Sequence, residues 1–163
     1  MKRFLRALAL AGLFLSATFA FSKTAQARDY RLDAHLNLGF YGTLGAGMRV
    51  DIPIMKKGLL HGIKDDLSIT FGADLFWIYK TYADVNAFGL SIPVAAQWNI
   101  QIGRSKWTYA PELGIMLTPF NYKYLGVVWP HIAPLSFRYK FNAKNEFLIR
   151  GVYPTGLQVG LTF

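Results

Sequence analysis

The 163-residue sequence predicts an all-β protein, an eight-stranded antiparallel up-and-down transmembrane β-barrel. Three observations predict this fold. Apolar and polar residues alternate along eight segments with the period of two at which strand side chains change faces. Several segments approach or exceed the ~9–11 residues that a tilted membrane-crossing strand needs. Aromatic residues form 16% of the chain and charged residues only 17%, which suits a surface that faces something other than water.

A targeting segment precedes the predicted barrel. Three basic residues open the chain, an apolar run at 8–21 follows, and Ala25-Gln26-Ala27 supplies a cleavage site. This is the pattern of a secretory signal peptide, and the apolar run is short for a membrane-spanning helix of ~20 residues. We therefore expect residues 1–27 to be a cleaved signal peptide for the Sec pathway and residues 28–163 to be one barrel domain.

The predicted strands, in chain order, are residues 32–40, 44–54, 67–79, 88–100, 107–117, 133–141, 147–153 and 156–163. The first two set Leu, Ile and Val against Gly, Asp and Asn. The third and fourth are longer and add Phe and Trp to the apolar face. Phe76 and Ile78 interrupt this pattern, because they fall on the polar face of the third strand.

The last four strands follow the same pattern with two irregularities. The fifth and sixth oppose Leu and aromatic residues to Thr, Glu, Ser and Arg, and the eighth alternates without exception up to Phe163. The seventh is weaker, because Leu148 and Val152 share its polar face with Arg150. The strands also contain prolines, which lack a ladder donor and predict local bulges, at Pro53, Pro93, Pro111 and Pro134.

Aromatic residues that were not used to place the strands form two bands when both termini are placed in the periplasm. Such girdles mark the two interfaces of membrane barrels. The periplasmic band contains Trp98, Trp107, Tyr109, Tyr139 and Phe141. The outer band contains Trp77, Tyr79 and Trp129.

The polar face of the strands collects charged residues that we expect to fill the lumen as a network of ion pairs. Eight strands enclose a space only wide enough for side chains, and an unpaired buried charge is costly. The predicted lumen network is Asp33, His35, Arg49, Asp51, Asp74, Glu112, Arg138 and Arg150. A narrow path for water or small ions through the same groups is the alternative.

The signal peptide, the eight alternating strands and the final strand resemble small outer-membrane barrels of the OmpA/OmpX type. In that family assembly machinery reads the C-terminal strand, and the residues here that match such a signal are Tyr153, Leu161 and Phe163. The resemblance implies a non-enzymatic protein of the bacterial outer membrane, with a structural or interaction role, no cofactor, and a periplasmic or surface partner still to be identified. The chain departs from the family in its two minimal outer loops and its long periplasmic connection at 55–66.

Three other functions stay open. A narrow channel needs an open lumen. A soluble, lipocalin-like secreted barrel needs inverted faces, for which Phe76 and Ile78 are the best indication. A lipid-modifying outer-membrane enzyme would use His131, expected to face lipid near the outer rim, but no Ser or acidic partner is found beside it.

Composition and spacing exclude other kinds of site. A lumenal Ser-His-Asp triad on Asp33 and His35 is disfavoured, because nothing fixes its geometry. No metal or nucleotide motif is present. The chain has no Cys, and its charge of +9 is not gathered in one run, so neither a thiolate site nor nucleic-acid binding is expected.

Overall fold

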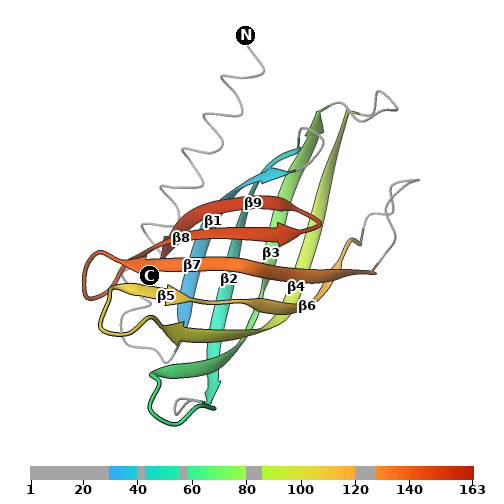
Figure 1. Cartoon of the computed structure of the whole chain (residues 1–163). Helices are drawn as coiled ribbons and strands as arrows, with labels where there is room; N and C mark the ends of the chain where they lie inside the picture. The colour runs from blue at the N-terminus through green and yellow to red at the C-terminus, as the bar shows by residue number, and fades with distance from the viewer. Residues whose placement is uncertain (1–29, 40–42, 56–58, 80–85, 120–127) are drawn as a thin grey trace.

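The computed structural model describes residues 30–39, 43–55, 59–79, 86–119 and 128–163. Over these ranges the chain is all-β and forms one closed, eight-stranded antiparallel barrel (Figure 1). No helix in these ranges is long and apolar enough to cross a membrane. The predicted signal peptide, residues 1–27, lies outside the described residues.

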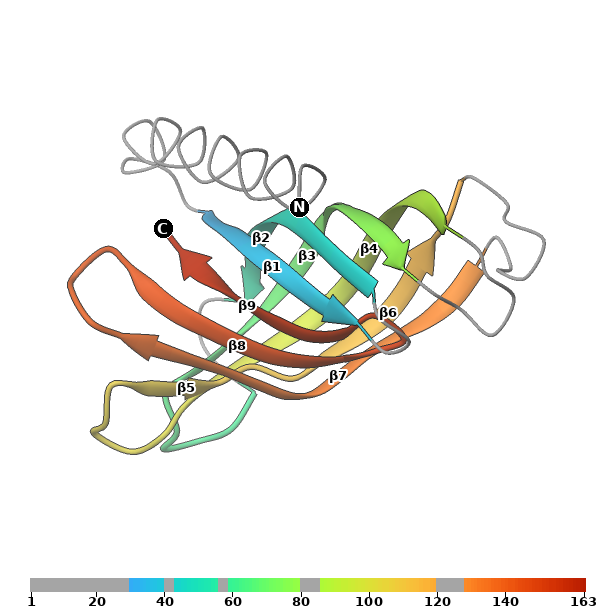
Figure 2. The ribbon, with the colours of Figure 1, turned by 90° about the horizontal axis from the view of Figure 1, so that it is seen from above.

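Nine strand segments make up the eight strands of the wall. They are β1 (Arg31–Gly39), β2 (Thr43–Met55), β3 (Asp65–Tyr79), β4 (Asn86–Gln101), β5 (Trp107–Tyr109), β6 (Glu112–Leu117), β7 (Val128–Lys140), β8 (Glu146–Tyr153) and β9 (Gly156–Thr162). Segments β5 and β6 are two parts of one wall strand, since both pair with β4 on one side and β7 on the other. Antiparallel pairing of β1 with β9 closes the barrel, as the view from above shows (Figure 2). All eight predicted strands are confirmed.

The strand prolines lie where the ladders are irregular. The β2–β3 register shifts between Pro53 and Met55, and the β7–β8 register shifts across Pro134. Pro111 lies in the break between β5 and β6, and Pro93 lies in a gap of the β3–β4 ladder. A proline cannot donate to a ladder, so the sheet adjusts at each of these positions. The bulges predicted at Pro53 and Pro134 are confirmed. Those predicted at Pro93 and Pro111 are wrong, because the registers of β4 with β3, β5 and β6 do not shift there.

The two faces of the wall have opposite chemistry. Charged residues such as Arg49, Arg138 and Arg150 are at most 1% exposed and lie inside the barrel. Large apolar residues point outward, among them Leu75 at 60% and Leu113 at 66% exposure. The predicted direction of the polar face is therefore confirmed, and Leu148 and Val152 are buried inside as their position in the pattern indicates.

One prediction about β7 is wrong. His131 and Ala133 are fully buried and Ile132 is exposed, although the pattern placed His131 and Ala133 outside. The bulge at Pro134 adds one residue to β7 and reverses the phase of every residue before it. Trp129 shares the face of His131 and pairs with the buried Met116, so it does not belong to the outward-facing aromatic band.

The other described side chains of the predicted aromatic bands lie on the outer face of the barrel. Trp107 and Tyr139 have ring centroids 4.9 Å apart near the end that holds the C-terminus. Trp77 stacks on Phe88 at 6.1 Å near the opposite end. The exposed Phe141 and the half-buried Trp98 also lie toward the C-terminal end. The Tyr79 side chain lies outside the described part of the chain.

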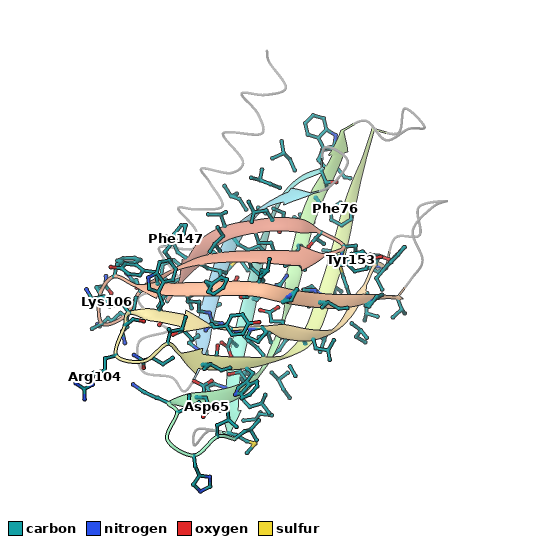
Figure 3. All side chains as sticks on the ribbon, viewed as in Figure 1. Asp65, Phe76, Arg104, Lys106, Phe147 and Tyr153 are labelled. Carbon is teal, nitrogen blue, oxygen red and sulfur yellow. The ribbon has the colours of Figure 1, made fainter. Side chains whose placement is uncertain are left out.

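The C-terminal strand is part of the closure. Phe163 exchanges backbone hydrogen bonds with Leu32 at the start of β1, with N–O distances of 2.8 and 3.2 Å. Leu161 pairs with Ala34 and is half-buried. Tyr153, at the end of β8, is exposed at the opposite end of the barrel from Phe147 (Figure 3).

Candidate functional site

The lumen contains a closed ring of six side chains whose potential charges alternate in sign. The members, in order around the ring, are Asp33, His35, Asp74, Arg49, Glu112 and Arg150. They come from β1, β2, β3, β6 and β8, so the ring joins strands from all around the wall. The period of two along β1 brings Asp33 and His35 to the same face.

His35 joins the first two acids of the ring. Its Nδ1 lies 2.6 Å from Asp33 Oδ1, and its Nε2 lies 2.8 Å from Asp74 Oδ1. Each carboxylate oxygen accepts a hydrogen bond, so both ring nitrogens donate only when the imidazole carries two protons. The geometry therefore fits a positively charged His35 between two negative neighbours.

Two arginines complete the ring. Arg49 places Nη2 3.4 Å from Asp74 Oδ2 and donates from Nη1 to Glu112 Oε2 at 2.9 Å. The Nη2 of Arg150 lies 2.9 Å from Glu112 Oε1 and donates to Asp33 Oδ2 at 2.8 Å, which closes the ring. Three cations and three anions balance one another, and this balance is what allows charges to be buried without a large desolvation penalty.

His131 joins the ring at Glu112 and is the main functional residue that the sequence pattern missed. Its Nε2 lies 2.9 Å from Glu112 Oε2 and 3.4 Å from Arg49 Nη1. Pro134 was the available signal, since a proline inside a strand indicates a bulge and a bulge reverses the faces before it. The lumen network therefore includes His131 in addition to the predicted residues.

A second polar cluster lies closer to the chain termini. Arg138 donates from Nη2 to Asp51 Oδ2 at 2.9 Å, and Arg31 Nε is 2.9 Å from the same oxygen. Arg31 Nη2 also donates to Asp66 Oδ1 at 2.9 Å, and Asn99 Nδ2 donates to that oxygen at 2.6 Å. Arg31 and Asp66 were missed because the pattern began the first strand at 32 and the third at 67.

The predicted lumen residues are thus brought together in two groups. The ring contains Asp33, His35, Arg49, Asp74, Glu112 and Arg150, and the second cluster contains Asp51 and Arg138. Both groups are buried inside the wall. All eight residues expected in the lumen are buried and ion-paired.

Small residues make room for the ring. Gly47, on β2, faces both His35 and Asp74, and a Cβ atom at this position would overlap Asp74 Oδ1. The same atom would lie 2.6 Å from His35 Nε2. Gly89 serves a similar purpose farther along the barrel, where a Cβ atom would overlap the ring of Phe76. Phe76 therefore lies against a glycine of the neighbouring strand on the inner face.

The ring is poorly suited to nucleophilic catalysis. Both nitrogens of His35 contact carboxylates, so neither is left to activate a serine. No group of His, Asp and Glu in the described part of the chain has the geometry of a metal site. The chemistry that the arrangement does support is the neutralisation of charge across the lumen.

No protein-family model, no curated protein and no solved structure matches this chain.

Proposed function

We propose that the chain is an integral β-barrel protein of the bacterial outer membrane, non-enzymatic, with a structural or interaction role and a lumen filled by side chains. The observation that carries this proposal is the inverted distribution of residues. Fully buried arginines lie inside, and large apolar side chains cover the outside of the wall. A water-soluble barrel of this size has the opposite need, because burial of apolar area in the core is what stabilises it.

The apolar exterior runs around the whole barrel. Leu75 on β3, Leu113 on β6 and Leu135 on β7 are each at least 60% exposed. Each Å² of apolar surface removed from water contributes about 25 cal/mol, so a lipid environment strongly favours this exterior. A closed barrel also pairs its backbone groups internally, as the hydrocarbon core of a bilayer requires.

The ring favours a closed lumen rather than a conducting channel. Its six members are paired across the interior, and its two arginines are at most 1% exposed. An ion passing this level would have to separate pairs in a medium of low dielectric constant, where each separation is costly. We therefore expect a silent planar bilayer, and single-channel steps from the unmodified protein would contradict the closed lumen.

The other two alternatives each lose the feature on which they depended. A lipocalin-like barrel requires apolar residues inside and charges outside, which is the reverse of the described side chains. A lipid-modifying enzyme was linked to a lipid-facing His131, but that residue is buried in the lumen. Asp33 and His35 are in contact, as a Ser-His-Asp triad would need. Asp74 contacts the other imidazole nitrogen of His35, so that nitrogen is not available to a serine.

Export and assembly follow the same proposal. The signal peptide directs the chain to the Sec pathway, and outer-membrane lipid then surrounds the exterior. β9 pairs with β1 to close the wall, so the terminal strand with Leu161 and Phe163 suits recognition by barrel-assembly machinery. A periplasmic or surface partner would complete an interaction role.

Fractionation followed by gel electrophoresis tests the proposal. The full chain is expressed in a Gram-negative host, and isolated outer membranes are run boiled and unboiled. We expect an outer-membrane band whose migration changes on boiling, because a closed barrel resists detergent until heated. A soluble periplasmic band without a heat shift would overturn the proposal.

A matched pair of substitutions sharpens this test. Leu113→Arg places a charge on the apolar exterior, which costs about 2–4 kcal/mol near the middle of a bilayer but little on a surface in water. Leu113→Met keeps the apolar character and serves as the control. We expect the arginine variant alone to lose the heat-shifted band, and equal behaviour of both variants would contradict a lipid-facing surface.

A further inference from the structure

The connection between β2 and β3 exposes apolar side chains where a turn in water would expose polar ones. Leu59, Leu60 and Ile63 are each more than 40% exposed, and none of them lies in a strand. Ile102, in the turn after β4, is exposed to a similar degree. The apolar exterior of the barrel therefore continues past the strand ends on this side.

Hydrogen bonds fix this connection against the wall. The Leu59 amide donates to Asp65 Oδ2 at 3.1 Å, and the Trp98 indole Nε1 donates to the same oxygen at 2.8 Å. The Gln101 amide donates to the Lys64 carbonyl at 2.9 Å, which holds the two turns side by side. Asp65 is 95% buried in this arrangement. The connection that exposes the apolar residues is therefore held in one conformation by buried hydrogen bonds.

Exposed cations lie at the same end of the barrel as these apolar residues. Lys64 lies at the end of the connection, and Arg104 and Lys106 lie in the adjacent turn at the same end of the barrel (Figure 3). The two nearby carboxylates already have partners. Asp65 accepts hydrogen bonds from Leu59 and Trp98, and Asp66 forms an ion pair with Arg31. The surface thus combines aliphatic and basic groups without an exposed carboxylate at 59–64 or 102–106.

We propose that this basic apolar surface, formed by Leu59, Leu60, Ile63, Ile102, Lys64, Arg104 and Lys106, is an anchor for anionic phospholipid in the periplasmic leaflet. Aliphatic groups enter the boundary between headgroups and acyl chains, and the basic groups meet lipid phosphates, as in interfacial membrane segments. The turn between β7 and β8 has no comparable exposed aliphatic side chains, because Asn142 to Asn145 are polar or small. The anchor is therefore confined to one side of the barrel. It rests on the proposed membrane location.

Site-directed spin labelling tests the anchor cleanly, because the chain contains no cysteine. Single variants Leu60→Cys, Ala143→Cys and Leu113→Cys place labels on the anchor, on the polar turn and on the barrel exterior. The full chain is reconstituted in vesicles of phosphatidylethanolamine and phosphatidylglycerol, and in vesicles of phosphatidylcholine alone. Collision with oxygen reports lipid, and collision with a water-soluble nickel chelate reports water.

In the anionic vesicles we expect the Leu60→Cys label to collide with nickel severalfold less than the Ala143→Cys label. Its nickel collision rate should rise in neutral vesicles. It should also rise on Lys64→Glu with Arg104→Glu, but not on Lys144→Glu in the control turn. Equal nickel accessibility at positions 60 and 143 would overturn the anchor.

Three further outcomes distinguish failure of the anchor from failure of the proposed membrane location. A Leu60→Cys label that is shielded from oxygen and nickel alike would indicate contact with a second copy of the chain, and would also overturn the lipid anchor. A Leu113→Cys label that is open to nickel would contradict the membrane location itself. A lipid-exposed position 113 with a water-exposed position 60 would leave the proposed function standing and remove only the anchor.

Discussion

Arg150 and Asp33 are 117 positions apart in the chain, yet Arg150 Nη2 lies 2.8 Å from Asp33 Oδ2 in the lumen. This contact joins β8 to β1 across the intervening β9. The same guanidinium group lies 2.9 Å from Glu112 Oε1 on β6. One buried cation therefore neutralises two acids from distant strands.

Arg150→Met should be strongly destabilising, because it leaves Asp33 and Glu112 buried beside an apolar side chain. Removing one partner of a buried ion pair costs roughly 3–5 kcal/mol. The measurement is urea unfolding of the reconstituted barrel, with tryptophan fluorescence as the readout. Lys140→Met, at the exposed end of β7, is the control and should change the free energy of unfolding by less than about 0.5 kcal/mol. Equal unfolding midpoints for the two variants would refute a stabilising role for the ring.

His35 and Asp74 should show strong energetic coupling. His35→Phe leaves two carboxylates facing each other, so it should be destabilising on its own. Asp74→Asn should destabilise the parent protein but stabilise the His35→Phe variant, because it removes the one negative charge that His35→Phe leaves unbalanced in the ring. A double-mutant cycle in urea measures this reversal of sign. Additive effects of the two substitutions would show that the contact at Nε2 carries no coupling.

Gly47 should tolerate no side chain. The added methyl group of Gly47→Ala would overlap Asp74 Oδ1 and crowd His35 Nε2, so part of the ring must move. We expect a loss of about 1–3 kcal/mol, the usual range for overpacking. Gly151→Ala is the matched control, since its methyl group would lie 3.6 Å from Leu135 Cβ, an ordinary contact. The midpoint of thermal unfolding in detergent compares the two, and an equal loss would assign the effect to the backbone.

Much of the fold could be predicted from the sequence, because alternation in a strand fixes the face of each residue. That rule put the eight residues of the expected lumen network, from Asp33 to Arg150, on one face of the strands, and all eight are buried. It could not place His131, because Pro134 signals a bulge without showing how the strand absorbs the extra residue. It also missed Arg31 and Asp66, which lie at strand ends where the alternation no longer identifies a face. The pairing of charges within the ring depends on strand register, which alternation alone does not determine.

The bulge at Pro134 yields the last prediction. Deleting Pro134 removes the extra residue of the bulge, so β7 becomes continuous with His131 and Arg138 both still facing the lumen. We expect the deletion to retain the heat-shifted band, because no buried charge has to face lipid or lose its partner. Loss of the band would show that β7 does not close up across the deletion. Pro134→Ala keeps the residue count and should retain the band. Deletion of Ala143, in the exposed turn after β7, controls for the shortened chain.

Tyr109 provides an independent check of the same bulge. Its hydroxyl group donates to the Pro134 carbonyl at 2.8 Å, which satisfies an acceptor at the point where the ladder is irregular. Tyr109→Phe should therefore cost about 1 kcal/mol of unfolding free energy while leaving the aromatic contact with Phe137 in place. In the Pro134 deletion background this loss should vanish, because the accepting carbonyl is gone. An undiminished loss there would mean that the hydroxyl group stabilises the barrel by some other contact.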